Sequence, residues 1–390
     1  MNILAIETSC DETSLSYISA NETELGTRFQ VFSTITNSQI NLHQEFGGVF
    51  PALAKREHQK NLPIILEQIM QEREIPDYIC VTSGPGLEPA LWCGIVFAKE
   101  LGEKWNIPVV PVNHMEGHIL SVLVPGSPLL PGEGLGVRFE FKNSDLKFPA
   151  LALLISGGHT ELVVVKNIGD YSIIGRTRDD AVGEAFDKVA RMLGIPYPGG
   201  PEVSKLAAQV RTNLTRSPNG AHPLLEGEGS TPVFPRPMMH TKDFDFSFSG
   251  LKTAVLYYSQ TISTPSPRKA SALPLSKGET PNISDSDKMA IALEFENAVA
   301  EVLVHKTKKA LEEFGVQTLI IGGGVSANTF IKSEMQKMIT ENFPETILLV
   351  PEKELTGDNA LMIALAGYFK IKKDPTRVYE NIVAEGNLSL

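Results

Sequence analysis

The order of strand and helix signals repeats along this chain of 390 residues, and the repeat is the strongest constraint on its fold. The first 36 residues contain three runs with strand character, NILAIETS, TSLSYIS and RFQVFSTIT, and strand–helix alternation follows to residue 112. From residue 149, three further runs, PALALLIS, TELVVVKNI and YSIIGRTR, open a second series of the same kind. Two halves that each begin with a three-stranded meander predict a duplicated α/β protein that binds a ligand between its halves.

Helical periodicity fills the stretches between these strands. It predicts helices over 49–72, 87–105, 182–194, 201–213, 250–260 and 285–314, and strands over 75–84, 318–323 and 346–351.

The repeat suggests a division of the chain into lobes. We expect an N-terminal lobe over 1–123, a C-terminal lobe over 149–370 and a tail over 371–390. Two stretches rich in Pro, Ser and Gly, 124–148 and 263–284, have the composition of exposed, partly disordered inserts, the second within the C-terminal lobe.

Composition limits the class of protein. Apolar residues make up 42% of the chain and charged residues 21%, as in soluble globular proteins. No apolar run approaches the length that spans a bilayer, and the N-terminus resembles neither a secretory signal nor a transit peptide, so we expect a cytoplasmic protein without membrane contact. Three cysteines without a C-x-x-C pair argue against a disulfide framework or a zinc ribbon.

The net charge of −11 argues against autonomous, salt-driven binding of nucleic acid over the whole surface. It leaves room for a local basic patch or a basic partner subunit.

Three polar turns could hold phosphate groups. ETSCDETS (7–14) and SGGHTE (156–161) each join two strands, and IGGGVSAN (321–328) joins a strand to a helix. Such turns expose backbone N–H groups to phosphate oxygens, although Asp11 and Glu12 repel phosphate unless a metal ion or a proton intervenes. The glycine spacing differs from that of a Rossmann dinucleotide fingerprint. Together the turns indicate a nucleotide between two lobes, as in actin and the sugar kinases.

The helix beginning at GEAFDKVARMLG carries a second candidate contact. Asp187 could accept hydrogen bonds from a ribose, with Gly199 and Gly200 allowing close approach of backbone to the same ligand. The alternative is a capped surface helix whose charges lie in solvent.

The stretch VNHMEGHIL places His114 and His118 four residues apart, on one helix face with Cβ atoms about 6 Å from each other. They could bind one metal ion, or be ordinary polar residues on a helix flank. A metal ion needs a further donor. Asp358 in LTGDNALMIALAGY is the best candidate, although an Asp at a helix start is also a standard N-cap.

Seven motifs resemble the TsaD family of tRNA N6-adenosine threonylcarbamoyltransferases, once named glycoproteases. They are ETSCDETS, NHMEGHI, LLISGGHTEL, GEAFDKVARMLGIPYPGGP, FDFSFSGLKTAV, IGGGVSAN and TGDNALMIA, in the family's order and over nearly the whole chain outside the inserts. FDFSFSGLKTAV and HMEGH resemble the bacterial type.

The resemblance implies an actin-like (ASKHA) duplicated two-lobed α/β fold with threonylcarbamoyl-AMP between the lobes. His114, His118 and Asp358 correspond to the family's metal ligands, and Asp11 and Glu12 lie close to its reacting end. The family's adenylate-binding positions correspond to Leu154, Ile155, Ser156, Gly157, Gly158, Asp187, Gly200 and Asn328.

The implied reaction is acyl transfer to the exocyclic amine of an adenosine beside the tRNA anticodon, with AMP as leaving group. Asp11 or Glu12 could accept the proton that the amine loses. The implied cofactor is one divalent ion, iron(II) favoured over zinc, although two histidines and a carboxylate suit either. The implied partners are tRNA, a TsaB-like paralogous subunit and a TsaE-like P-loop ATPase.

Three rival functions remain to be weighed. A zinc protease helix needs H-E-x-x-H, whereas here Glu116 follows one residue late and projects about 100° further round the helix. A kinase or ATPase of the same fold would use Mg²⁺, which prefers oxygen ligands to imidazole. The complete set of motifs argues against a non-catalytic subunit.

Overall fold

Two mixed sheets with the same strand order form the centre of the computed structural model, which describes residues 1–124, 137–142, 144–216, 232–263 and 283–390. Within these residues, the first sheet has the order β5-β4-β1-β2-β3-β6 and the second β11-β10-β7-β8-β9. In each sheet an antiparallel meander is extended by two parallel strands on the side of its first strand. The duplicated, actin-like architecture predicted from the sequence is confirmed.

The strands of the first sheet are β1 (Asn2–Glu7), β2 (Glu12–Glu22), β3 (Gly26–Ser38), β4 (Tyr78–Gly84), β5 (Val109–Asn113) and β6 (Val137–Lys142). Those of the second are β7 (Ala150–Ile155), β8 (Thr160–Asn167), β9 (Asp170–Arg176), β10 (Thr318–Gly322) and β11 (Ile347–Leu349).

The helices are α1 (Ile40–His43), α2 (Pro51–Met70), α3 (Glu88–Trp105), α4 (His114–Leu120), α5 (Val182–Met192), α6 (Gly200–Arg216), α7 (Ser249–Ser263), α8 (Asp285–Phe314), α9 (Thr329–Asn342) and α10 (Ala360–Lys373). Helices α2, α3, α5, α6, α7 and α8 lie close to the six predicted ranges.

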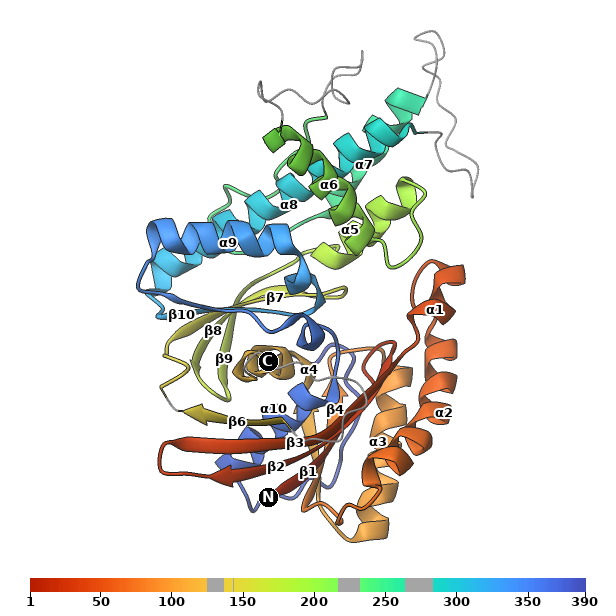
Figure 1. Cartoon of the computed structure of the whole chain (residues 1–390), viewed down its shortest axis with the longest axis vertical. Coiled ribbons are helices and arrows are strands. Elements are labelled where there is room, and N and C mark those ends of the chain that lie inside the picture. The colour runs from red at the N-terminus through yellow and green to blue at the C-terminus, as the bar shows by residue number, and fades with distance from the viewer. Residues whose placement is uncertain (125–136, 143, 217–231, 264–282) are drawn as a thin grey trace.

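Helices pack on both faces of each sheet (Figure 1). Helices α2 and α3 cover the outer face of the first sheet, and the group α5 to α9 lies beyond the second. Between the sheets lie α4 and α10, packed in one apolar cluster against strands of both sheets. Since both faces of the second sheet are covered, β7 is a continuous run of buried apolar residues, ALALLI.

The described part of the stretch 124–148 corrects the prediction of an exposed insert. Residues 137–142 form β6, which pairs antiparallel with β3 at the edge of the first sheet. Its sequence VRFEFK alternates apolar and polar residues, and Phe139 and Phe141 are buried, Phe139 stacking on Phe29. Residues 264–282 of the other predicted insert lie outside the described part.

Helix α10 follows the second sheet in sequence but packs on the strands of the first, so the chain returns to its first lobe near its end. None of the described helices is both long and apolar enough to cross a membrane.

Candidate active site

The two histidines project from the start of a short helix. Strand β5 ends at Asn113, whose side-chain oxygen accepts hydrogen bonds from the backbone N–H groups of Met115 and Glu116 and so caps α4. His114 and His118 are both buried on this helix, with ring centres 4.7 Å apart and ring planes near perpendicular.

Asp358 completes a triad with these histidines. Its Oδ1 lies 3.4 Å from Nε2 of His114 and 3.2 Å from Nε2 of His118. The N-cap of α10 is the next residue, Asn359, whose side chain accepts from the N–H of Met362. The alternative reading of Asp358 as a helix cap is therefore wrong, and its carboxylate is free to face the histidines.

The triad has the donors that a divalent metal ion requires. One ligand atom from each of the three residues lies within 4.8 Å of the others. Nδ1 of the fully buried His118 ring has no hydrogen-bond partner among the described residues, and Nε2 faces only the carboxylate of Asp358. A buried polar atom without a partner is costly, and two imidazoles with one carboxylate suit zinc or iron(II). These residues fit a bound metal ion.

Charge balance in the triad supports the same reading. Burial alone would lower the pKa of His114, but the carboxylates of Asp358 and Glu7 outweigh it and raise this pKa well above its usual range. Burial would raise the pKa of Asp358, but the two imidazoles outweigh it and hold that pKa below its usual range. Without metal, a proton on His114 therefore supplies the positive charge that the carboxylates need.

Glu7, at the end of β1, is a site residue that the sequence-based prediction missed. Its Oε2 lies 3.0 Å from Nδ1 of His114 and accepts a hydrogen bond from the hydroxyl of Thr82 at 2.6 Å. A carboxylate on Nδ1 fixes the ring so that Nε2 faces the position shared with Asp358. The available signal was a charged residue closing an otherwise apolar strand, NILAIE.

Asp11 and Glu12 lie in the same turn, beside the triad. Asp11 is buried, and its Oδ2 has no hydrogen-bond partner among the residues described. Burial raises the pKa of Glu12 well above its usual range, and the charges of Asp11 and Asp358 add to the effect. This turn therefore concentrates negative charge against the metal-ligand candidates, as its composition indicated.

The glycine turns of the second sheet meet at the histidine helix. A Cβ on Gly322 would lie 2.8 Å from the carbonyl oxygen of His118, and one on Gly323 would lie 2.5 Å from that of Ile155. At Gly157 and Gly158 a Cβ would meet nothing within 4 Å, so protein packing does not require glycine there. The absence of side chains leaves room for a ligand to approach the backbone.

Asp187, on α5, has one oxygen engaged and one available. Its Oδ1 accepts hydrogen bonds from the backbone N–H groups of Gly199 and Gly200, at 2.8 and 3.2 Å. No described residue donates to Oδ2. Burial raises the pKa of this carboxyl, and the two N–H groups counteract the rise. The side chain is thus tied to the glycine turn, unlike that of a solvated surface helix.

Asn328 is held differently, because its amide has no free position. Its Oδ1 accepts from the N–H groups of Phe330 and Ile331, capping α9, and its Nδ2 donates to Ser204 and Glu296. All four hydrogen-bonding positions of the amide are occupied. Any contact of Asn328 with an adenylate therefore uses its backbone or carbon surface, or displaces one of these partners.

Glu116 points away from the triad. Its carboxylate accepts a hydrogen bond from the hydroxyl of Tyr171 on β9 at 2.8 Å. A protease glutamate would have to act on a metal-bound water, so this contact adds to the sequence argument against peptide hydrolysis.

Comparison with known proteins gives a consistent result. The family model "TsaD: tRNA N6-adenosine threonylcarbamoyltransferase" matches residues 30–365. A protein of this name from Thermosipho africanus is 39% identical over 96% of this chain and 95% of its own length, and one from Enterococcus faecalis is 38% identical over 99% and 95%. A crystal structure of full-length HypF, 11% identical, aligns with a TM-score of 0.52 over 97% of this chain and 47% of its own, a likeness of fold alone.

Proposed function

Because the chain belongs to the TsaD family of tRNA N6-adenosine threonylcarbamoyltransferases, we propose that it transfers a threonylcarbamoyl group from threonylcarbamoyl-AMP to N6 of an adenosine in tRNA. The adenosine is the one next to the anticodon in tRNAs that read codons starting with A. The observation that carries this function is the match over nearly the full length of the curated relatives. Because the substrate is tRNA, we place the protein in the cytoplasm.

The reaction is an acyl transfer from an activated donor, so positioning and charge stabilisation do most of the work. Oδ2 of Asp187 is available to accept a hydrogen bond from a ribose hydroxyl, and the open backbone at Gly157 and Gly158 leaves room for the adenylate phosphate. The donors on Gly199 and Gly200 hold the Asp187 carboxylate in place.

The attacking N6 amine loses a proton when its bond to the carbamoyl carbon forms and AMP departs. We propose that Asp11 accepts this proton. In support, Oδ2 of Asp11 is buried and receives no hydrogen bond within the described part of the chain. Glu12, whose pKa is raised by burial and by Asp11, is the second candidate.

His114, His118 and Asp358 would hold one divalent ion, for which we favour iron(II) over zinc. Two histidines and one carboxylate with open positions are the ligand set of non-haem iron sites, which supports that choice. When bound, the ion supplies Lewis acidity towards an oxygen of the adenylate. Glu7 orients the ring of His114 for this role.

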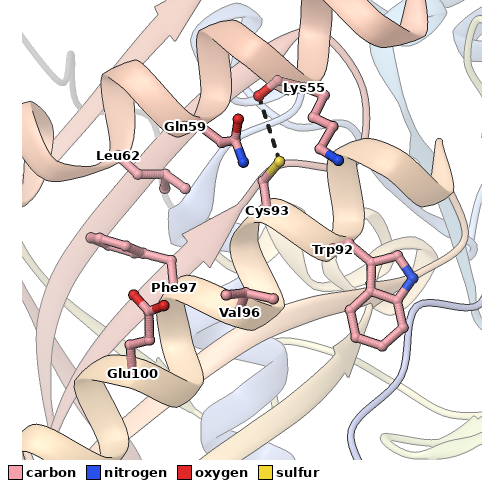
Figure 2. Close-up of a pocket in the computed structure, with 8 residues that line it drawn as sticks. All are labelled: Lys55, Gln59, Leu62, Trp92, Cys93, Val96, Phe97 and Glu100. Atoms are coloured by element: carbon pink, nitrogen blue, oxygen red, sulfur yellow. Dashed lines mark hydrogen bonds between the residues drawn. The ribbon is translucent and has the colours of Figure 1, made fainter.

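We further propose that a TsaB-like subunit and a TsaE-like P-loop ATPase assist the reaction. The net charge of −11 favours docking of tRNA with the help of partners. The outer helices also carry apolar surface: Trp92, Val96 and Ile64 are 39%, 48% and 47% exposed. Trp92 and Val96 on α3 line a cavity of about 280 Å³ between α2 and α3, whose lining residues are drawn in Figure 2. Such a face is suited to a protein partner.

The experiment that tests the function is mass spectrometry of tRNA nucleosides. The protein is incubated with threonylcarbamoyl-AMP, tRNA and the candidate partners, and a His118→Ala variant serves as the matched control. Threonylcarbamoyladenosine should form with the unaltered protein and not with the variant. Cleavage of a glycoprotein without modified adenosine would favour the protease, and phosphorylation of a small substrate would favour the kinase.

A further inference from the structure

The final stretch of the chain contacts Asn113, the residue directly before the metal-site candidate His114. We name residues 381–390 the tail segment. Its backbone is hydrogen-bonded to the end of β4 and to the turn that follows. The N–H of Glu385 donates to the carbonyl of Ser83 at 2.8 Å, and the N–H of Gly86 donates to the carbonyl of Gly386 at 3.0 Å. The crossing brings residues about 300 positions apart into backbone contact.

Glycines make this crossing close. A Cβ on Gly84 would lie 2.0 Å from the carbonyl oxygen of Glu385, and one on Gly386 would lie 3.0 Å from that of Gly86. Gly84 also has φ of +154°, a conformation that residues with side chains rarely adopt. The tail segment is therefore held against the turn at van der Waals distance and has little freedom to slide.

Asn113 joins the tail segment to the histidine helix. Its Oδ1 caps α4, and its Nδ2 donates to the backbone carbonyl of Ser389 at 3.2 Å. The Asn113 amide thus links the first turn of α4, which carries His114, to the backbone of the tail segment.

The same turn also reaches His114 by a second route. The N–H of Leu87 donates to the carbonyl of Ser9 at 2.8 Å, and the hydroxyl of Ser9 lies 3.2 Å from Nδ1 of His114. The tail segment therefore braces the histidine from the helix side through Asn113 and from the β1 side through the turn.

We propose that Asn113 and the tail segment form a positioning element for the metal site, with the Asn113–Ser389 contact as its link. The inference rests on the proposed metal site and adds to it two parts that bind neither metal nor adenylate. Binding constellations need their ligands held within about 0.5 Å, and supporting contacts achieve this. Loss of the link should leave α4 folded but let its first turn, and His114 with it, move.

The test uses metal-free protein titrated with Zn²⁺ against a chromophoric chelator, with thermal melting measured in parallel. Asn113→Ser keeps a good N-cap and loses the donor to Ser389. A chain ending at Gly386 loses the acceptor and keeps the cap. Each change should weaken zinc binding by about tenfold, the low end for residues supporting metal ligands. Combining them should add less than about twofold, because both break one link.

Lys99→Ala is the matched control. It removes a contact of the same kind, from the Lys99 ammonium to the carbonyl of Ile382, but on α3 and away from α4. Its zinc affinity should stay within about twofold of the unaltered protein.

The outcomes separate the two proposals. If the unaltered protein binds no zinc, the metal site itself is rejected, and the positioning role with it. If it binds zinc and Asn113→Ser binds equally well at a lowered melting temperature, the link is only structural and the proposal is overturned. Fully multiplicative losses in the double variant would also overturn it, because the two parts would then act separately.

Discussion

The candidate metal corner and the proposed adenylate side differ in how their polar atoms are hydrogen-bonded. The metal corner consists of His114, His118 and Asp358 with Glu7 behind them. Within the described residues, Nδ1 of its fully buried His118 ring lacks a hydrogen-bond partner. On the adenylate side, the amide of Asn328 is completely hydrogen-bonded, and Asp187 is tied to two backbone N–H groups.

This difference indicates which of the two regions is stabilised by a bound ion or ligand. Buried polar groups without partners are destabilising, so the metal corner gains stability when an ion or a proton fills it. Asn328 and Oδ1 of Asp187 already have partners in the protein, so we expect the adenylate side to keep its shape without a ligand. We therefore expect changes in the metal corner to act as a unit, and changes on the adenylate side to be smaller and separable.

The largest expected effect comes from the triad. His114→Ala, His118→Ala and Asp358→Ala should each reduce metal affinity by more than about a hundredfold and abolish most transfer activity. Pairing two of these changes should add little, because each already destroys one shared site. Metal content by elemental analysis and nucleoside mass spectrometry measure both effects. An Asp358→Ala protein that keeps its full metal content would show that the three residues do not form one metal site.

Glu7→Gln tests the residue behind the triad. The amide cannot supply the charge that fixes the Nδ1 proton of His114, so metal affinity should fall about 10–100-fold while the fold persists. Thr82→Val is the control, since it removes a hydrogen bond to the same carboxylate without touching the histidine. Equal losses in both variants would mean that Glu7 acts through packing alone.

Proton competition should follow from the raised pKa of His114. The carboxylates of Asp358 and Glu7 raise the pKa of His114 by more than burial lowers it, whereas burial lowers the pKa of His118. Below the raised pKa, metal affinity should fall about tenfold per pH unit, because the ion must displace one proton. His159 does not compete, because burial and the neighbouring histidines lower its pKa to about 4.

The metal-free protein should show the opposite trend in stability. Because the pKa of His114 is raised in the folded state, its protonation adds to the free energy of unfolding. This stabilisation is fully present below the ordinary histidine pKa and is lost as pH rises through the raised value. Melting temperatures across this pH range, with chelator and with metal, test both signs. If melting temperature depends on pH in the same way with chelator and with metal, His114 is not a metal ligand.

Asp187→Asn should act on the adenylate side alone. The amide can still accept from Gly199 and Gly200 but loses the charge at the oxygen available to ribose, an effect of about 1–3 kcal/mol on AMP binding. Metal content should match the unaltered protein. Calorimetry measures AMP affinity and elemental analysis measures metal content. Unchanged AMP affinity would mean that Asp187 does not contact the ribose.

The smallest expected effect is that of Asn328→Ser. Serine keeps the cap of α9 and loses the contact to Glu296, so stability should fall by about 1 kcal/mol, with AMP affinity nearly unchanged. Denaturant unfolding and AMP calorimetry measure the two. A large loss of AMP affinity at full stability would show that the amide exchanges a protein partner for the adenylate.

The elements of the fold were largely predictable because each half has strong local patterns. Strand alternation and helical periodicity located the meanders and the long helices, with ends differing by a few residues. Strand β6 was missed because the Pro- and Gly-rich residues around VRFEFK dominated the composition, although the six residues themselves alternate. Its pairing with β3 is a long-range contact that no local signal contains.

The candidate site was predictable only in part. Histidine spacing and the family motifs named His114, His118, Asp358 and Asp187, and the structure brings the first three together. Glu7 was not found, since one glutamate after an apolar strand is indistinguishable from a strand end. Sequence also left open whether Asp358 caps a helix, which the position of Asn359 decided.

The sequence by itself determined the duplicated α/β plan, the family and the residue types available for metal and nucleotide. Periodicity and motifs involve residues close together in the chain, so they can be read from the sequence alone. Only the tertiary structure decided which polar atoms remain without partners, that Glu7 lies behind His114, and that Ser389 contacts Asn113 at the start of the histidine helix. The physical reason is that hydrogen-bond satisfaction depends on all neighbours in space, and most of these neighbours are distant in sequence.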